Sequence, residues 1–117
     1  MKKNLNLILF FTLIITITSC IVEKPGEGER AAKGYQICSP IIAAIEDYRN
    51  KNDVYPDSLS ILFPNINNAS TVINDYPIVY KSIDAGKSFS LMFSYTRPGM
   101  NHCTYTPKKK WDCEGYY

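Results

Sequence analysis

Hydrophobic and polar residues follow a helical period in the first half of the chain. Between residues 31 and 50, apolar side chains recur every three or four positions, with charged residues between or beyond them. This spacing is typical of an amphipathic helix. Its apolar stripe consists of Ile37, Ile41, Ala44 or Ile45, and Tyr48. Because proline lacks the amide donor, Pro40 must either kink this helix or occupy its first turn with Ser39 as the cap. We favour a helix that starts at about Ala31 and is kinked at Pro40.

The stretch NKNDVYPDSLSILFPNI predicts the end of the helix and a short helical turn after it. The helix should stop at about residues 50–53, where Asn, Lys and Asp accumulate. The helical turn lies between two prolines and places Leu59, Leu62 and Phe63 on one face. Residues 65–75 are rich in Asn and Ser and predict a loop.

The period then changes to two, which predicts strands. In SFSLMFSYT, residues 88–96, large apolar side chains alternate with small or flexible ones, so one face packs on the helix and the other faces water. A strand over residues 77–82 precedes it, with a turn at 84–87. Shorter strands over 102–106 and 110–114 complete an antiparallel meander. The sequence therefore predicts an α+β fold, in which a long N-terminal helix packs on a sheet of three to four antiparallel strands.

The N-terminal segment FFTLIITITSC, residues 10–20, resembles two bacterial export signals. FFTL resembles the start of a type IV prepilin helix, whereas ITSC resembles the lipobox of lipoprotein precursors. The apolar run from Leu5 to Ile17 has 13 residues, whereas a membrane-spanning helix needs about 20. Phe10 and Ile15 also occupy positions where a prepilin has Gly and Glu. We therefore interpret residues 1–19 as a lipoprotein signal peptide. The alternative is an ordinary cleaved signal peptide with a free Cys20.

Acylation of Cys20 would attach the mature protein to a lipid bilayer without spanning it. Two or three acyl chains anchor stably, because each buried methylene contributes about 0.8 kcal/mol. Residues 20–30 are rich in Gly, Pro and charged residues and predict a flexible tether, so residues 31–117 form a single domain. By analogy, and for a source with two membranes, we expect a location in the cell envelope, on the outer membrane facing the periplasm.

The charge balance of the chain argues against one class of partner, nucleic acids. The full chain has 13 Lys and Arg against 11 Asp and Glu. Removal of residues 1–19 takes two lysines with it and leaves 98 residues with balanced charge. This balance argues against a nucleic-acid partner. The one basic run, Lys108 to Lys110, is interpreted as a solvated turn between two strands, with contact to anionic lipid as the alternative.

The helix IIAAIEDY, followed by YPDSL, LFP and an antiparallel sheet, resembles a known family. It is similar to the soluble part of type II secretion major pseudopilins and other type IV pilin-like proteins, over about residues 31–95. The resemblance implies a pilin-like fold and no catalytic residue. The chain departs from the family in lacking the prepilin cleavage site and the long N-terminal helix that assembles fibres. Its C-terminal stretch NHCTYTPKKKWDCEGYY looks like the tail of small bacterial lipoproteins, which implies no activity.

The three remaining cysteines can be assigned from the predicted hairpin. If Tyr105 and Trp111 face each other across a turn centred on Lys108, Cys103 and Cys113 are cross-strand partners on the same face. A disulfide fits there in an oxidising compartment. Cys38 lies beside the apolar helix stripe, where a buried small hydrophobic side chain is the simpler interpretation and a reactive or intermolecularly bonded thiol is the alternative.

No residue pattern indicates catalysis, a metal or a cofactor. A Cys–His nucleophile would need Cys38 to approach His102, the single histidine. The spacing of Cys103 and Cys113 fits no zinc template, and neither a phosphate-binding loop nor a dinucleotide fingerprint is present. Glu46 and Asp47 are adjacent on a helix, so their side chains diverge. We expect a protein that is not an enzyme.

Two functional classes remain. The first is a structural or interaction module of the cell envelope that contacts a protein partner through exposed tyrosines. Our candidates for these contacts are Tyr105, Tyr116 and Tyr117. The second is a periplasmic inhibitor or immunity protein directed against a toxin or hydrolase. The sequence does not choose between them.

Overall fold

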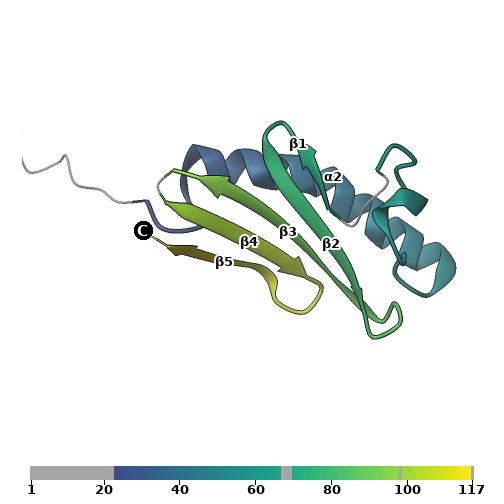
Figure 1. Cartoon of the computed structure of the whole chain (residues 1–117). Helices are drawn as coiled ribbons and strands as arrows, with labels where there is room; N and C mark the ends of the chain where they lie inside the picture. Colours follow the sequence, from purple (N-terminus) through teal and green to yellow (C-terminus); the bar gives the residue numbers. More distant parts are fainter. Residues whose placement is uncertain (1–22, 67–69, 98, 117) are drawn as a thin grey trace, which may run out of the picture.

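The fold combines one long helix with one antiparallel sheet (Figure 1). The structure, a computed structural model, describes residues 23–66, 70–97 and 99–116. The predicted signal peptide, residues 1–19, and Cys20 lie outside the described residues. Helix α2 spans Gly28–Asn52, and a short 3-10 helix, η1, spans Leu59–Ile61. The strands, in both chain and sheet order, are β1 Ser70–Ile73, β2 Tyr76–Ile83, β3 Ser88–Thr96, β4 Met100–Thr106 and β5 Lys110–Tyr116.

The predicted α+β class is confirmed, but the described part of the chain forms a sheet of five strands instead of three to four. The additional strand, β1, lies in the stretch that the sequence predicted as a loop. It pairs with β2 through a two-residue turn at Asn74 and Asp75, whose φ angles are 47° and 68°. Positive φ at both positions matches the right-handed twist of the paired strands, and Asn and Asp tolerate this conformation well. The prediction missed β1 because four residues give too little alternation.

Helix α2 begins earlier than predicted. Residues 28–30 are helical, so the predicted tether of residues 20–30 was too long at its C-terminal end. Ala31 and Gly34 are buried against the sheet, and such packing stabilises a first turn that composition alone does not favour. Pro40 lies within the helix, which excludes its placement in the first turn.

The buried stripe of the helix is also rotated from the predicted one. Its centre consists of Ala31, Gly34, Cys38, Ile41 and Ile45, whereas Ile37 and Tyr48 are only half-buried at its side. Gly34 explains the rotation, because a Cβ atom there would lie 2.2 Å from the Phe93 ring. Small residues therefore let the helix approach β3 closely, and a pattern weighted toward large side chains does not detect this contact.

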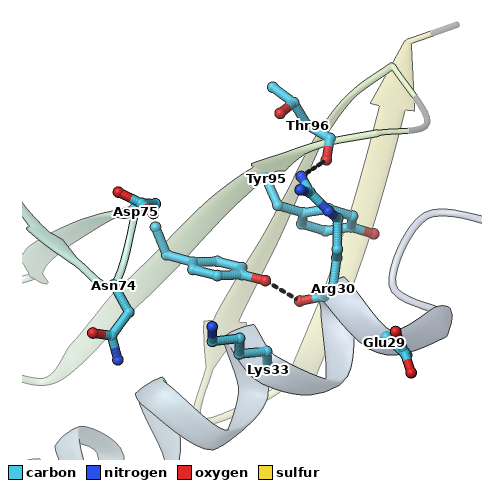
Figure 2. Close-up of a pocket in the computed structure, with 8 residues that line it drawn as sticks. Glu29, Arg30, Lys33, Asn74, Asp75, Tyr95 and Thr96 are labelled. Carbon is cyan, nitrogen blue, oxygen red and sulfur yellow. Dashed lines mark hydrogen bonds between the residues drawn. The ribbon is translucent and has the colours of Figure 1, made fainter.

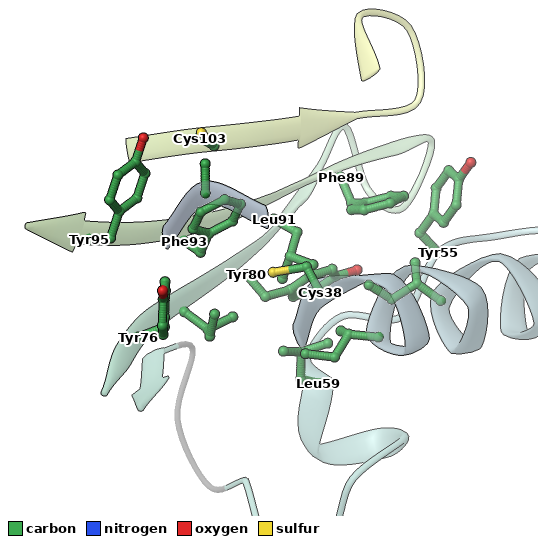
Figure 3. Close-up of a cluster of buried hydrophobic side chains, with 14 residues drawn as sticks. Cys38, Tyr55, Leu59, Tyr76, Tyr80, Phe89, Leu91, Phe93, Tyr95 and Cys103 are labelled. Atoms are coloured by element: carbon green, nitrogen blue, oxygen red, sulfur yellow. The ribbon is translucent and has the colours of Figure 1, made fainter. Parts of the chain in front are cut away.

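The core lies between α2 and the inner face of the sheet (Figure 3). Phe89, Leu91 and Phe93 of β3 are fully buried, and Tyr95 is 7% exposed, as the alternation in SFSLMFSYT predicted. Tyr76 donates a hydrogen bond of 2.8 Å to the Arg30 carbonyl. Hydrogen bonds of this kind satisfy buried phenol groups and join the sheet to the helix.

The segment after α2 seals the other end of the core. The helix ends at Asp53, which has a φ of 63° and donates its amide to Arg49 O at 2.8 Å. Tyr55 then pairs its amide with Gly86 O at 2.9 Å, and Tyr80 donates its hydroxyl to Pro56 O. Leu59, on the predicted apolar face of the short helical turn, is 1% exposed and packs in the core. Within the described residues, no helix is long and apolar enough to cross a membrane.

Candidate functional site

The predicted β4–β5 hairpin is confirmed in register and in its disulfide. Tyr105 pairs with Trp111, and Cys103 pairs with Cys113, to which it is bonded. The half-cystines lie on the inner face, because Cys103 also pairs with the buried Phe93. The disulfide therefore fixes β5, the last strand, to the sheet close to the helix.

The disulfide also contacts the segment that precedes α2, which we name the strap and define as Lys24–Glu27. Gly26 donates its amide to the Tyr95 hydroxyl and accepts a hydrogen bond from the Tyr35 hydroxyl, each at 2.9 Å. A Cβ atom on Gly26, whose φ is 86°, would lie 2.6 Å from Cys113 Sγ. The strap is therefore packed on the domain, and it fixes where the N-terminal part of the chain leaves the fold.

A pocket of about 410 Å³ lies beside the strap (Figure 2). Arg30 and Lys33 rise from α2 on one side, and the β1–β2 turn with Asn74 and Asp75 forms the other. The Arg30 guanidinium donates a hydrogen bond to the Thr96 carbonyl. Glu29, Tyr76 and Tyr95 complete the lining. Sequence analysis did not single out this pocket, because its residues come from three separate parts of the chain.

The second candidate site is the sheet face that points away from α2, which we name the open face. Cross-strand partners share a face, so the partners of exposed residues define it. Its centre consists of Pro77, Val79, Met92, Ser94, His102 and Thr104. Val72 and Met100 lie on the same face and are 66% and 69% exposed. A hollow of about 270 Å³ near Met100, His102 and Pro77 marks its strap end.

One of the three tyrosines predicted as contacts lies on the inner face of the sheet. Tyr105 lies on the inner face and is half-buried, which corrects our expectation of an exposed side chain. Its ring stacks on Phe89 with centroids 5.9 Å apart and meets Trp111 edge-on at 5.4 Å. The periodicity of β4 places residue 105 on the same face as Cys103, which is the reason for its burial. Tyr116 ends β5, and Tyr117 lies outside the described residues.

Cys38 and His102 lie on opposite sides of the sheet. Cys38 is fully buried in the core, and burial raises the pKa of its thiol to about 12. A thiol with so high a pKa is protonated and unreactive at neutral pH. His102 is on the open face, where its Nε2 lies 3.9 Å from Glu114 Oε2. The sheet therefore separates the only Cys–His pair that the sequence offered.

The other charged candidates form local contacts or are exposed to solvent. Glu46 accepts hydrogen bonds of 3.3 Å from the Tyr55 hydroxyl, and Asp47 pairs with Lys51 at 2.9 Å. Lys108 and Lys109 are exposed in the β4–β5 turn, as predicted. In the described part of the chain, no group of three or more His, Cys, Asp or Glu residues is arranged to hold a metal ion.

A scan against protein-family models, a search of curated proteins and a search of solved structures each found no significant match to this chain.

Local sequence patterns do not mark the residues that position the strap and the adjoining pocket wall. Gly26 was interpreted as part of a tether, although a glycine next to Pro25 is also a signal for a turn with positive φ. Tyr35 and Tyr95 bind the strap from α2 and β3. Their hydroxyl partners depend on tertiary contacts, which no local pattern encodes.

Proposed function

We propose that the protein is a lipid-anchored, non-catalytic interaction module of the cell envelope that binds a protein partner through its open face. The observation that carries this proposal is the asymmetry of the sheet. Helix α2 covers one face, whereas the other face presents Val72 and Met100 at 66% and 69% exposure. Exposed apolar side chains on one surface, rimmed by polar ones, are typical of protein-binding sites.

The position of the strap supports the anchoring part of the proposal. The strap crosses the inner side of the sheet beside Cys113, so the anchor would hold the domain without covering Met92 or Val79. Acylation at Cys20 and an outer-membrane location facing the periplasm remain proposals from the lipobox. A long helix preceding an antiparallel sheet is also compatible with the pilin-like resemblance, which we retain as a proposal about architecture.

A double variant with a matched control tests the binding surface. In the acylated full-length chain, Val72→Ser with Met100→Ser removes the two most exposed apolar groups of the open face. Ile61→Ser is the control, because Ile61 is 50% exposed in η1, outside the open face. After crosslinking in cells, we expect the double variant to lose most partner capture and the control to retain it.

Equal capture by both variants would refute the open face as the binding surface. The identity of the captured protein separates the two functional classes. Capture of an envelope-assembly or secretion protein supports the interaction module, whereas capture of a toxin or hydrolase would replace it with the inhibitor.

A further inference from the structure

The pocket beside the strap presents charges of both signs that do not neutralise one another. Arg30 and Lys33 are one helical turn apart on α2, and Glu29 and Asp75 supply two carboxylates. Within the described residues, none of these four side chains forms an ion pair. The pocket therefore offers cationic and anionic groups to a ligand that carries both charges.

The floor of the pocket consists of two buried tyrosines that are held by hydrogen bonds. Tyr76 and Tyr95 are each 7% exposed, and their hydroxyls are bonded to the Arg30 carbonyl and the Gly26 amide. A volume of about 410 Å³ lies within the range of roughly 300–1,000 Å³ that is usual for small-molecule sites. A preformed floor lowers the entropic cost of binding, so charged contacts at the exposed rim can contribute to affinity.

The location of the pocket indicates the source of the ligand. Gly26 is bonded to Tyr95, a residue of the pocket wall, and it follows Cys20 by six residues. Six residues span at most about 20 Å of extended chain. If Cys20 is acylated, as proposed above, Gly26 lies within this distance of the membrane surface, and the pocket wall bonded to it lies close to a region where phospholipid headgroups are abundant.

We propose that this pocket binds the phosphoethanolamine headgroup of a zwitterionic phospholipid. Arg30 and Lys33 bind the phosphate, because charge-assisted hydrogen bonds from such groups are stronger than neutral ones. On the opposite side of the pocket, the Asp75 carboxylate accepts hydrogen bonds from the ammonium group. Contact with a headgroup would also restrict how the domain is oriented on the bilayer.

A titration of the mature chain, residues 20–117, in maltoside micelles tests the proposal, and it is run with and without acylation of Cys20. Phosphoethanolamine is added, and amide chemical shifts are followed by NMR. We expect saturable shifts at residues 33 and 75. Lys33→Gln and Asp75→Asn should each weaken binding about five-fold. Both changes should preserve the fold, because Lys33 has no partner in the described structure and Asn tolerates the φ of 68° at position 75.

Two variants at the opposite end of the sheet serve as controls. Lys87→Gln removes an exposed lysine, and Asp84→Asn changes an exposed turn residue whose φ is 52°. Neither should alter the binding of phosphoethanolamine. The assignment of the pocket would be overturned if Lys87→Gln weakened binding as much as Lys33→Gln, or if Asp84→Asn weakened it as much as Asp75→Asn.

Two soluble probes and two lipids in nanodiscs sharpen the chemistry. Inorganic phosphate and glycylglycine should each bind more weakly than phosphoethanolamine, since each lacks one part of the headgroup. Equal binding of either probe, or no saturable shift with phosphoethanolamine, would overturn the proposal. In nanodiscs, phosphatidylethanolamine should shift residues 33 and 75, and phosphatidylcholine should not. Binding of the soluble probe without the nanodisc effect would assign the pocket to a soluble ligand instead.

The outcome does not depend on the test of anchoring. The micelle titration measures the pocket whether or not Cys20 is acylated, and labelling with a palmitate analogue measures acylation whether or not the pocket binds. Failure of one proposal is therefore distinguishable from failure of the other.

Discussion

The two faces of the sheet are built from the same strands but differ in burial. On β3, Phe89 and Phe93 are fully buried on the inner face, whereas Ser90 and Ser94 on the open face remain partly exposed. The inner face is constrained by rings, a disulfide and a closely approaching helix. The open face has none of these constraints on its centre. Alternation along one strand thus separates residues that maintain the fold from residues that are available for contact.

The largest expected effect comes from truncating the inner face. Phe93→Ala should lower the free energy of unfolding by about 3–5 kcal/mol, because it leaves a cavity next to Gly34 and Tyr35. Met92→Ala, one position away on the open face, should cost less than about 1 kcal/mol. Urea unfolding followed by circular dichroism measures both. Similar losses for the two variants would mean that the faces do not differ as described.

Removal of the disulfide should have the next largest effect. Cys103→Ala with Cys113→Ala opens a short loop, so we expect a loss of about 2 kcal/mol, near the low end for disulfides. The same urea titration, run on the oxidised parent and the double variant, gives the difference. Peptide mapping without reductant should show the 103–113 linkage in the parent. A linkage that includes Cys38 would contradict the register of the β4–β5 hairpin.

Substitution of Gly26 tests whether the strap is packed on the inner face of the sheet. Gly26→Ala combines a strained φ with a Cβ atom 2.6 Å from Cys113 Sγ, and it should cost about 1–2 kcal/mol. Gly28→Ala is the control, because its φ is 89° but its nearest neighbour is the flexible carboxylate of Glu23. Thermal or urea unfolding measures the loss of unfolding free energy in each variant. The two losses should differ by the cost of the clash with the disulfide. Equal losses would show that the strap is not packed on Cys113.

The pH dependence of stability should report the burial of Cys38. Its folded pKa of about 12 lies above the ordinary 9.0, so the folded state favours the neutral thiol. This contribution is fully present below pH 9 and is lost as the pH rises from 9 toward 12. At pH 9.5 the parent should have lost about 1 kcal/mol more than Cys38→Ala, because buried tyrosines with raised pKa values contribute equally to both profiles. An identical pH profile for both proteins would place Cys38 in contact with water.

Much of the fold follows from local pattern. The helix, the β3 alternation and the β4–β5 hairpin depend on repeated spacing over many residues, and the pairing of Cys103 with Cys113 follows from that hairpin. Strand β1 and the true helix stripe were missed for physical reasons. A four-residue strand carries little periodic signal, and the closeness of α2 to β3 depends on Gly34, which adds no hydrophobic area.

The candidate sites were less predictable than the fold. Tyr105 was chosen as a contact by residue type, but its position in β4 places it on the inner face. The open face contains Ser, Thr, Met and Val residues that no motif distinguishes from an ordinary solvated strand. The pocket beside the strap depends on α2 meeting the β1–β2 turn, and this contact exists only in the assembled fold.

Photocrosslinking from the two sides of the domain tests the central claim most directly. A photoreactive amino acid replaces Met92 on the open face or Ala43 on the exposed side of α2, in the acylated full-length chain. After irradiation of cells, we predict a discrete protein adduct from position 92 and none from position 43. The absence of an adduct from position 92, with or without an adduct from position 43, would contradict binding through the open face.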